Sequence, residues 1–319
     1  MLVVKTKTSN PSISRGSALW RLLLSALLLL AVNACTTTVK PQVGMLPDPS
    51  PPLNESVDHK LANMSVEDLL RDGHKYLAQG NPQLAGLYFN LARMKEPDNL
   101  PALYGQGEIL RLQADFAGAQ PIYEKILSLD QDSPKALLSL GEANLYQGNY
   151  DKAASYLQRV LEKAPDHPQA LSLLAMTWDG AGETAKAETL YLRLAHISPR
   201  SAAVHNNLGV NRLFQGRYQE AISSLSIAVN LDPDNKRTQN NLAMAYALAG
   251  DESQALEIFQ QSLGKAAAYN NMGYLYMKKG MFADAEKSLL KAIEYNPSYY
   301  PQAQRNLQRL QAMRTTEGH

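Results

Sequence analysis

The chain of 319 residues lacks several features that would indicate chemistry. It has a single cysteine, Cys35, so no disulfide can form within one chain. Its six histidines are scattered, and none stands at metal-ligand spacing from a cysteine, aspartate or glutamate. It also has no loop of the kind that cradles phosphate. We therefore expect no catalytic residue, no metal ion, no cofactor and no small-molecule substrate.

An excess of basic charge is also missing. The chain has 31 Lys and Arg residues against 30 Asp and Glu residues. Four of the basic residues and none of the acids lie within residues 1–34, so the rest of the chain has 27 basic and 30 acidic side chains, a net charge of −3. Because nothing remains to attract phosphate groups, we expect no binding to nucleic acid.

The N-terminal apolar run is too short to cross a bilayer. It extends over eleven residues, from Leu22 to Val32, whereas a spanning helix needs about 20. Basic residues precede it at Lys5, Lys7, Arg15 and Arg21. A positive segment followed by a short apolar run is typical of a cleaved signal peptide, which we assign to residues 1–34.

The end of this segment, Val32-Asn33-Ala34-Cys35, resembles a bacterial lipobox. The resemblance implies that Cys35 is acylated, with a fatty acid such as palmitate, and that the protein is held on a membrane by this lipid anchor. Thr36 follows Cys35, and by resemblance to proteobacterial lipoproteins this implies sorting to the outer membrane, with the folded part facing the periplasm. The alternative is an ordinary secretory signal with an incidental cysteine.

A proline-rich segment separates this cysteine from the rest of the chain. Residues 35–64 contain few apolar side chains and five prolines, Pro41, Pro47, Pro49, Pro51 and Pro52. Such a composition cannot bury enough apolar surface to fold. We predict a disordered, semi-extended tether.

Residues 66–299 contain seven copies of one pattern. A small residue recurs at steps of 34, with a last step of 30, at Gly73, Gly107, Gly141, Ala175, Gly209, Ala243 and Gly273. An alanine column follows at the same steps, at Ala85, Ala119, Ala153, Ala187, Ala221, Ala255 and Ala285. Four residues after each alanine stands a large apolar residue: Phe89, Tyr123, Leu157, Tyr191, Leu225, Phe259 or Leu289. A fixed period held by independent columns indicates a stack of repeats.

Each copy is predicted to be a pair of helices. Apolar residues fall at i, i+3, i+4 and i+7, which is one face of a helix, and the small column lets two helices approach closely. Glycine marks the turn between the helices at Gly80, Gly148, Gly182, Gly216, Gly250 and Gly280, and proline marks the end of the unit at Pro97, Pro165, Pro199, Pro233 and Pro297. Two copies depart from the pattern: the second has Ala114-Asp115 at its turn, and the sixth is four residues short and ends at Gly264-Lys265.

These residues resemble the tetratricopeptide repeat. The resemblance implies an all-α fold, a right-handed superhelical solenoid of seven helical hairpins that forms one folded unit and binds other proteins. Residues 300–319 are expected to form a capping helix and a tail, because the last unit of a stack must cover an open apolar end.

Asparagine pairs recur in the first helices of the last three repeats, at Asn206-Asn207, Asn240-Asn241 and Asn270-Asn271. The second asparagine of each pair matches the position that forms an asparagine ladder in some tetratricopeptide proteins. A carboxamide offers both a donor and an acceptor, so it suits a peptide unit whatever its side chain. We expect these residues to bind an extended partner segment in the concave groove; the alternative is that they hydrogen-bond within and between repeats. Other residues expected in this groove are Val210, Phe214, Arg237, Met244, Tyr274 and Lys278, and further back Tyr104, Glu108, Leu138 and Tyr146.

The stretches from Asn240 to Asp251 and from Tyr269 to Tyr274, behind a lipobox, resemble the tight-adherence (Flp-type) pilus assembly lipoproteins, the TadD-like group. This resemblance implies a scaffold that assists assembly of an envelope-spanning pilus or secretion system, with a secretin or another pilus component as partner. Two alternatives stay open. One is an envelope adaptor that recruits peptidoglycan hydrolases or proteases, and the other is a type IV pilus pilotin.

Overall fold

The helices begin and end where the sequence places its caps and turns. The computed structural model describes residues 61, 63–296 and 301–317. At the first helix, the Ser65 hydroxyl accepts a hydrogen bond from the amide of Asp68 at 3.1 Å, and at the second the Asn81 side chain accepts one from the amide of Leu84, with Pro82 at the first helical position. Both are N-cap arrangements that satisfy an amide without an intrahelical partner.

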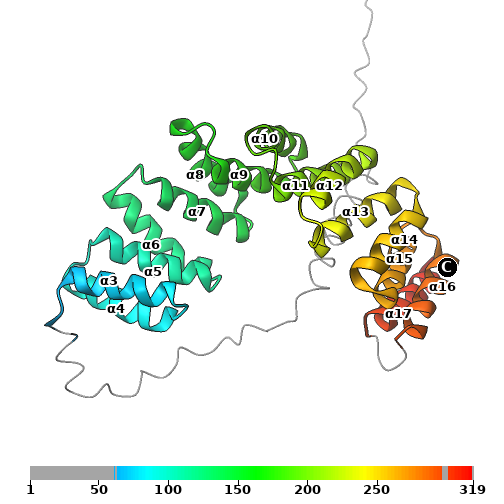
Figure 1. Cartoon of the computed structure of the whole chain (residues 1–319), viewed down its shortest axis with the longest axis horizontal. Coiled ribbons are helices and arrows are strands. Elements are labelled where there is room, and N and C mark those ends of the chain that lie inside the picture. Colours follow the sequence, from blue (N-terminus) through cyan, green and yellow to red (C-terminus); the bar gives the residue numbers. More distant parts are fainter. Residues whose placement is uncertain (1–60, 62, 297–300, 318–319) are drawn as a thin grey trace, which may run out of the picture. The chain divides into compact units, whose positions relative to one another are not determined.

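Fifteen α-helices and no strand occupy the described residues (Figure 1). They are α3 (Val66–Ala78), α4 (Pro82–Lys95), α5 (Leu100–Leu112), α6 (Phe116–Leu129), α7 (Pro134–Tyr146), α8 (Tyr150–Lys163), α9 (Pro168–Gly180), α10 (Thr184–Ile197), α11 (Ala202–Phe214), α12 (Tyr218–Leu231), α13 (Lys236–Ala249), α14 (Glu252–Leu263), α15 (Lys265–Lys278), α16 (Phe282–Glu294) and α17 (Pro301–Glu317). The helices from α3 to α16 form consecutive pairs, each containing one copy of the repeat, and α17 follows the last pair. The predicted all-helical class is confirmed.

The small column and the large column of the repeat meet in space. A Cβ atom added to Gly107 would stand 2.7 Å from the Tyr123 ring, and one added to Gly209 would stand 2.5 Å from Leu225. The same contact joins Gly73 to Phe89, Gly141 to Leu157 and Gly273 to Leu289. All five large side chains are fully buried. The glycine in the first helix therefore makes the space that the large residue of the second helix fills.

The turn within each hairpin uses a left-handed residue. Six glycines supply it, at Gly80, Gly148, Gly182, Gly216, Gly250 and Gly280, with φ between 73° and 96°. The second repeat lacks this glycine, and Ala114 takes the same conformation at φ 57°. The turn is thus kept, although an alanine in this region costs about 1–2 kcal/mol.

The shortened sixth repeat has no connecting segment. Gly264, at φ 83° and ψ 165°, is at once the C-cap of α14 and the N-cap of α15. In the next hairpin, Tyr269 of α15 and Tyr295, the C-cap of α16, stack with ring centroids 5.4 Å apart. Lys265 lies over the Tyr295 ring at 5.3 Å and Lys291 over the Tyr269 ring at 5.0 Å. These paired contacts fasten α15 to α16.

The described residues form two compact units, and the boundary lies between Val204 and His205. The repeat pattern predicts a single folded unit instead. The N-terminal unit contains α3 to α10, and the C-terminal unit contains nearly all of α11 and every helix after it. In a stack, each hairpin contacts only its neighbours, so no long-range contact ties distant hairpins together. α17 extends to Glu317 and buries Ala303 and Leu310 against Leu289 and Ala292 of α16, as expected of a cap.

Gly105→Ala should destabilise the protein by about 1–3 kcal/mol, the usual cost of overpacking a core. The Phe89 ring lies between Gly73 and Gly105, and a Cβ on Gly105 would stand 2.5 Å from it, so the ring has no room to move away. Gly86→Ala is the matched control, because its Cβ would meet only Ile109, at 3.8 Å. It should stabilise by up to about 1 kcal/mol, since alanine favours a helix over glycine. Urea unfolding of both variants tests this; equal effects would contradict the packing account.

Candidate functional site

The three asparagine pairs lie on α11, α13 and α15, the first helices of the hairpins in the C-terminal unit. Asn241 donates its Nδ2 to Asn206 Oδ1 at 2.9 Å, and Asn206 donates to Asn207 Oδ1 at 3.3 Å. The first bond links α13 to α11, and the second lies within α11. The asparagines of neighbouring repeats therefore hydrogen-bond to one another.

The same arrangement recurs at the end of the stack. Asn306 of α17 donates its Nδ2 to Asn270 Oδ1 at 3.0 Å, and Asn270 donates to Asn271 Oδ1 at 3.4 Å. In the middle pair, Asn240 Oδ1 accepts a hydrogen bond from the Ser262 hydroxyl at 3.0 Å. The first asparagine of every pair thus forms a bond to another helix, as the alternative interpretation of these residues expects.

Burial separates the predicted site residues into two groups. Asn240, Asn241, Asn270 and Met244 are between 3% and 7% exposed, so they contact the rest of the protein on nearly every side. The partly or fully exposed group comprises Asn206, Asn207, Val210, Phe214, Arg237, Asn271, Tyr274 and Lys278. That these residues bind a partner stays a prediction, and the exposed group is the part that a partner can reach directly.

Asn207 and Asn271 keep free hydrogen-bonding capacity. Each uses its side-chain oxygen to accept a bond from the preceding asparagine, and within the described residues neither donates its Nδ2 hydrogens to another group. Both amides are partly exposed. A carboxamide in this state can donate to a peptide carbonyl.

Asn271, Tyr274 and Lys278 form one stripe on α15, because residues at i, i+3 and i+7 share a helix face. The Lys278 ammonium lies 5.5 Å from the centre of the Tyr274 ring. Burial raises the pKa of Tyr274, and the positive charge of Arg309 on α17 opposes this. Burial lowers the pKa of Lys278, and Arg309 lowers it further. Arg309 is not among the residues predicted from the sequence, where the arginines of α17 were its only signal.

The predicted residues of the N-terminal unit occupy a different surface. Glu108 is paired with Arg111 at 2.7 Å, and Arg111 lies 3.6 Å from Glu142. The hydrogen bond from Arg111 holds the pKa of Glu108 below its usual value. Tyr104 contacts the Ser133 hydroxyl and lies beneath Lys135. Arg111 therefore lies between two carboxylates of this surface.

The two remaining predicted residues of this unit differ in exposure. Leu138 is buried at 8% exposed, whereas Tyr146 is 56% exposed and stacks on Phe116 with ring centroids 4.8 Å apart.

The remaining predictions concern the N-terminal segment, membrane spans and metal sites. The signal segment 1–34, Cys35 and the predicted tether up to residue 60 lie outside the described residues. The prediction that the tether extends to residue 64 is wrong, because Leu61 is helical and only 8% exposed and Met64 packs against the apolar cluster of the first hairpin. In the part of the chain that is described, no helix is long and apolar enough to span a bilayer. Within the same part, no three His, Cys, Asp or Glu side chains are grouped so that they could hold a metal ion.

Three sequence models of the tetratricopeptide repeat match this chain. They cover residues 110–175 and 144–208, residues 200–266 and residues 266–299, which together make up more than half of the chain. The chain belongs to the tetratricopeptide repeat family. Proteins of this family mediate protein–protein interactions, and the fold is typically non-enzymatic.

Curated relatives match over shorter stretches. DnaJ homolog subfamily C member 3 of Rattus norvegicus is 31% identical over 98 residues, which make up 30% of this chain and 19% of that protein. Photosystem I assembly protein Ycf3 of Synechococcus sp. (strain CC9311) is 30% identical over 106 residues, 30% of this chain and 61% of that protein. The chain thus spans less than two thirds of the length of either relative.

A solved structure shows the same fold over a longer range. The tetratricopeptide repeat protein from Parabacteroides merdae ATCC 43184 superposes with a TM-score of 0.60 at 19% identity, over 77% of this chain and 98% of that chain. This likeness concerns the fold alone.

Asn241→Ala should destabilise the protein by about 1–3 kcal/mol, because it removes a buried amide and leaves the Asn206 oxygen without its inter-repeat donor. Asn207→Ala is the matched control on the same ladder position, where the side chain is partly exposed; its effect should stay within about 0.5 kcal/mol, as for most surface substitutions. Chemical unfolding followed by circular dichroism measures both. If the two variants were equally stable, the inter-repeat bond would not contribute.

Proposed function

We propose that this protein is a membrane-tethered scaffold whose C-terminal unit binds an extended segment of a partner protein in the groove formed by its first helices. The observation that carries the proposal is the pair of partly exposed amides, Asn207 and Asn271, whose Nδ2 hydrogens have no acceptor within the described residues. They are spaced two repeats apart, on α11 and α15. Donors repeated along a groove suit the evenly spaced carbonyls of an extended peptide.

The neighbouring side chains support a peptide ligand. Val210 and Phe214 on α11 and Tyr274 on α15 are partly exposed. Aromatic and apolar groups beside hydrogen-bond donors are typical of surfaces that bind proteins. The amides would hold the main chain of the partner, and the apolar groups would select its side chains.

The tether is the second part of the proposal. The lipobox-like segment ending at Cys35 supports an acylated N-terminus, and an acyl chain contributes about 0.8 kcal/mol for each buried methylene. An outer-membrane anchor would hold the repeats in the periplasm, within reach of envelope machinery.

The assembly role is the third part. The helices around Asn240–Asp251 and Tyr269–Tyr274 resemble those of tight-adherence (Flp-type) pilus assembly lipoproteins. We infer that the partner is a secretin or another component of an envelope-spanning pilus or secretion system. One of the curated relatives is itself named an assembly protein, which is compatible with a scaffold role.

Photo-crosslinking in intact cells tests the partner and the binding face together. A photoreactive residue at Phe214, on the first helix α11, should capture a secretin or pilus subunit. The same residue at Ile227 is the matched control, because this side chain is 45% exposed on the second helix α12 of the same hairpin.

The identity of the captured protein decides between the candidate functions. Capture of peptidoglycan hydrolases or proteases would replace the assembly role with that of an envelope adaptor, and capture of a type IV secretin would indicate a pilotin. Capture of the same partner from Ile227 but not from Phe214 would show that the groove is not the binding face.

Cys35→Ala tests the anchor. Without the thiol no acyl chain can be attached, so the protein should move from the membrane fraction to the soluble fraction, and metabolic labelling with palmitate should be lost. Fractionation followed by immunoblotting measures this. Membrane association that is unchanged in the variant would contradict the lipid anchor while leaving the groove untouched.

A further inference from the structure

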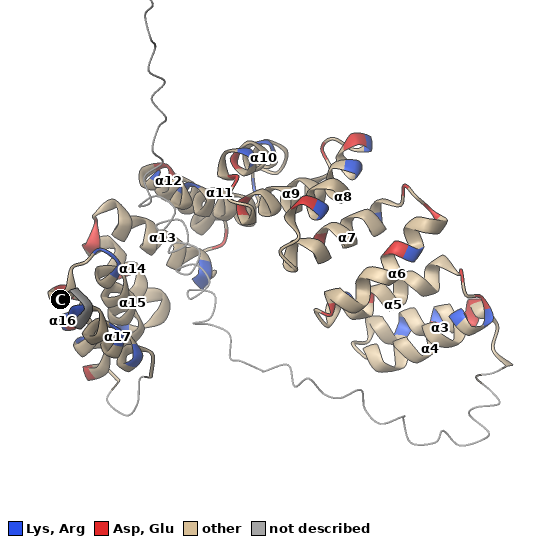
Figure 2. Ribbon diagram, turned by 180° about the vertical axis from the view of Figure 1, so that it is seen from behind, with Lys and Arg blue, Asp and Glu red and all other residues tan. Residues whose placement is uncertain are grey.

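One face of α4 is apolar although it lies at the surface of the first hairpin (Figure 1). Its side chains follow one another at i, i+3, i+7 and i+10, and they are Leu84, Leu87, Leu91 and Met94. Leu84 is 38% exposed and Met94 is 79% exposed, whereas the two leucines between them are half-buried. α4 also contains no Asp or Glu (Figure 2). These four side chains, the α4 stripe, are therefore only partly covered by the repeats.

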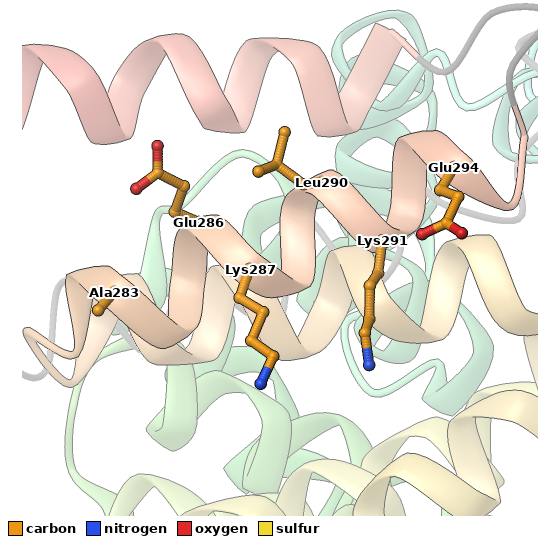
Figure 3. Close-up of a pocket in the computed structure, with 6 residues that line it drawn as sticks. All are labelled: Ala283, Glu286, Lys287, Leu290, Lys291 and Glu294. Carbon is orange, nitrogen blue, oxygen red and sulfur yellow. The ribbon is translucent and has the colours of Figure 1, made fainter.

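The α4 stripe is not a feature of the repeat. At its first three positions in the other six hairpins, the only large aliphatic residue is Ile227. Figure 3 shows Lys287 and Lys291, which extend from the same side of α16 and stand at the positions of Leu87 and Leu91. Because the other second helices have almost no apolar residues at these positions, packing of the hairpins does not require them in α4.

The α4 stripe lies beside the chain that enters α3. In the second hairpin, Lys125 of the second helix pairs at 2.7 Å with Asp98, which precedes the first helix, and the fourth hairpin has the same pair at 2.8 Å. Thirty-four residues before Lys125 and Asp98 stand Leu91 and Met64. Both pack against one apolar cluster, and Lys95 donates its Nζ to the Met64 carbonyl at 2.7 Å. In the first hairpin, apolar packing thus takes the place of the ion pair.

The chain is helical and buried before it reaches α3. Leu61 and Asn63 are helical, and Leu61 is buried. On the N-terminal side, Leu53 and Val57 precede Leu61 and Met64 at helical spacing. These four apolar residues fall within an arc of about 80° on a helix that turns by about 100° for each residue. The acids and the histidine between them fall outside this arc, so the segment has the pattern of an amphipathic helix.

We propose that residues 51–63 form a helix that lies along α4, with Leu53, Val57 and Leu61 against the α4 stripe. A helix of this length is marginal alone, because most helical stability in proteins comes from the packing of an apolar face. The α4 stripe supplies the surface for that packing. The added helix closes the N-terminal end of the stack, as α17 closes its C-terminal end, since a terminal unit must cover an open apolar face.

The start of this segment has the residues of a helix N-terminus. Ser50 is followed by Pro51, the same order of capping residue and proline as Asn81 and Pro82 at α4. Pro52 falls in the first turn, where a proline removes no helical hydrogen bond. The segment thus has the cap and the apolar face that a helix needs.

This segment fits the α4 stripe better than a second copy of the chain or a lipid surface does. It is joined to the protein at the end of the stripe, so its effective concentration there is far higher than that of a free partner. Four side chains on one helix are too few for a stable dimer, which buries about 800 Å² on each partner. An anionic lipid surface would be repelled by the acids of α3, which are Glu67, Asp68 and Asp72.

Docking of this helix changes what the predicted tether does. Only residues 36–50 then separate Cys35 from a helix that is packed on the first hairpin. A force on Cys35 acts on the α4 stripe and hence on the repeats. The proposed groove belongs to the first helices of the C-terminal unit, so this contact is independent of it.

Hydrogen exchange of the full-length protein in detergent, measured by mass spectrometry, tests this contact. After correction for the intrinsic rate of each sequence, the amides of residues 55–60 should exchange at least about tenfold more slowly than those of residues 36–50, because helical hydrogen bonds and packing protect them. Exchange of both segments at the same rate would overturn the inference.

Leu84→Ser together with Leu87→Ser should release the helix and raise the exchange rate of residues 55–60 about tenfold. Neither side chain is fully buried, so the repeats should stay folded, which circular dichroism checks. Leu192→Ser is the matched control, because this leucine is 48% exposed on α10, the second helix of another hairpin. Unchanged protection in the double variant, or an equal loss in the control, would contradict docking on the α4 stripe.

Substitutions within the segment give a second test that leaves every residue of the repeats in place. Val57→Asp puts a charge on the apolar face and should raise the exchange rate of residues 55–60 about tenfold. His59→Asp puts the same charge on the opposite side of the helix and should change this rate by less than about twofold. If both variants lost protection equally, the apolar face would not be what α4 recognises, and the inference would fail.

The other occupants of the α4 stripe are outcomes of two further measurements. The Cys35→Ala protein should sediment as a monomer and should not bind vesicles of anionic phospholipid. A dimer that Leu84→Ser with Leu87→Ser dissociates would assign the stripe to a second copy, and vesicle binding lost in the same variant would assign it to a membrane. Either result would overturn the inference, and neither affects the capture of a partner from Phe214, which tests the proposed function.

Discussion

One contact between a glycine or alanine and a large side chain governs this architecture. In five of the seven hairpins a glycine of the first helix lies against the large residue sixteen positions later in the second helix, as Gly107 lies against Tyr123 and Gly209 against Leu225. Burying such a side chain contributes about 1.5–3 kcal/mol, but only if the two helix backbones approach closely enough to enclose it. The contact sets the distance between helices in these hairpins. Because this distance fixes the position of each first helix, it also fixes the position of the asparagines on that helix.

Much of the fold could be predicted because the information is local and repeated. The caps at Ser65 and Asn81, the left-handed glycines and the small and large columns all act within one hairpin, so the sequence of that hairpin specifies them. Ala114 shows the limit of this reasoning. The repeat predicts a turn at this place although no glycine is present, and the turn forms because the packing of α5 on α6 requires it.

The candidate site could be predicted only in part. The sequence identifies the asparagine pairs, but it does not distinguish a side chain that stays exposed from one that is bonded to the next repeat. Asn241 is buried because its amide reaches Asn206, thirty-five positions earlier, and a contact between repeats is not visible in either repeat alone. Arg309 was missed for the same reason: its nearness to Lys278 depends on how α17 packs on α15. No contact within the described residues determines the lipid anchor, the identity of the partner or a role in pilus assembly.

The shared cap at Gly264 has a consequence for how this repeat array can change in length. At the other junctions several residues lie between one hairpin and the next, so an added or lost residue can be absorbed in the connection. Between α14 and α15 a single glycine ends one helix and begins the other, and its φ of 83° is open to few other residues. A shift by one residue there would rotate α15 by about 100° about its axis and turn the Asn271 stripe away from α17. The last two hairpins and the cap are therefore expected to be gained, lost or exchanged as one block.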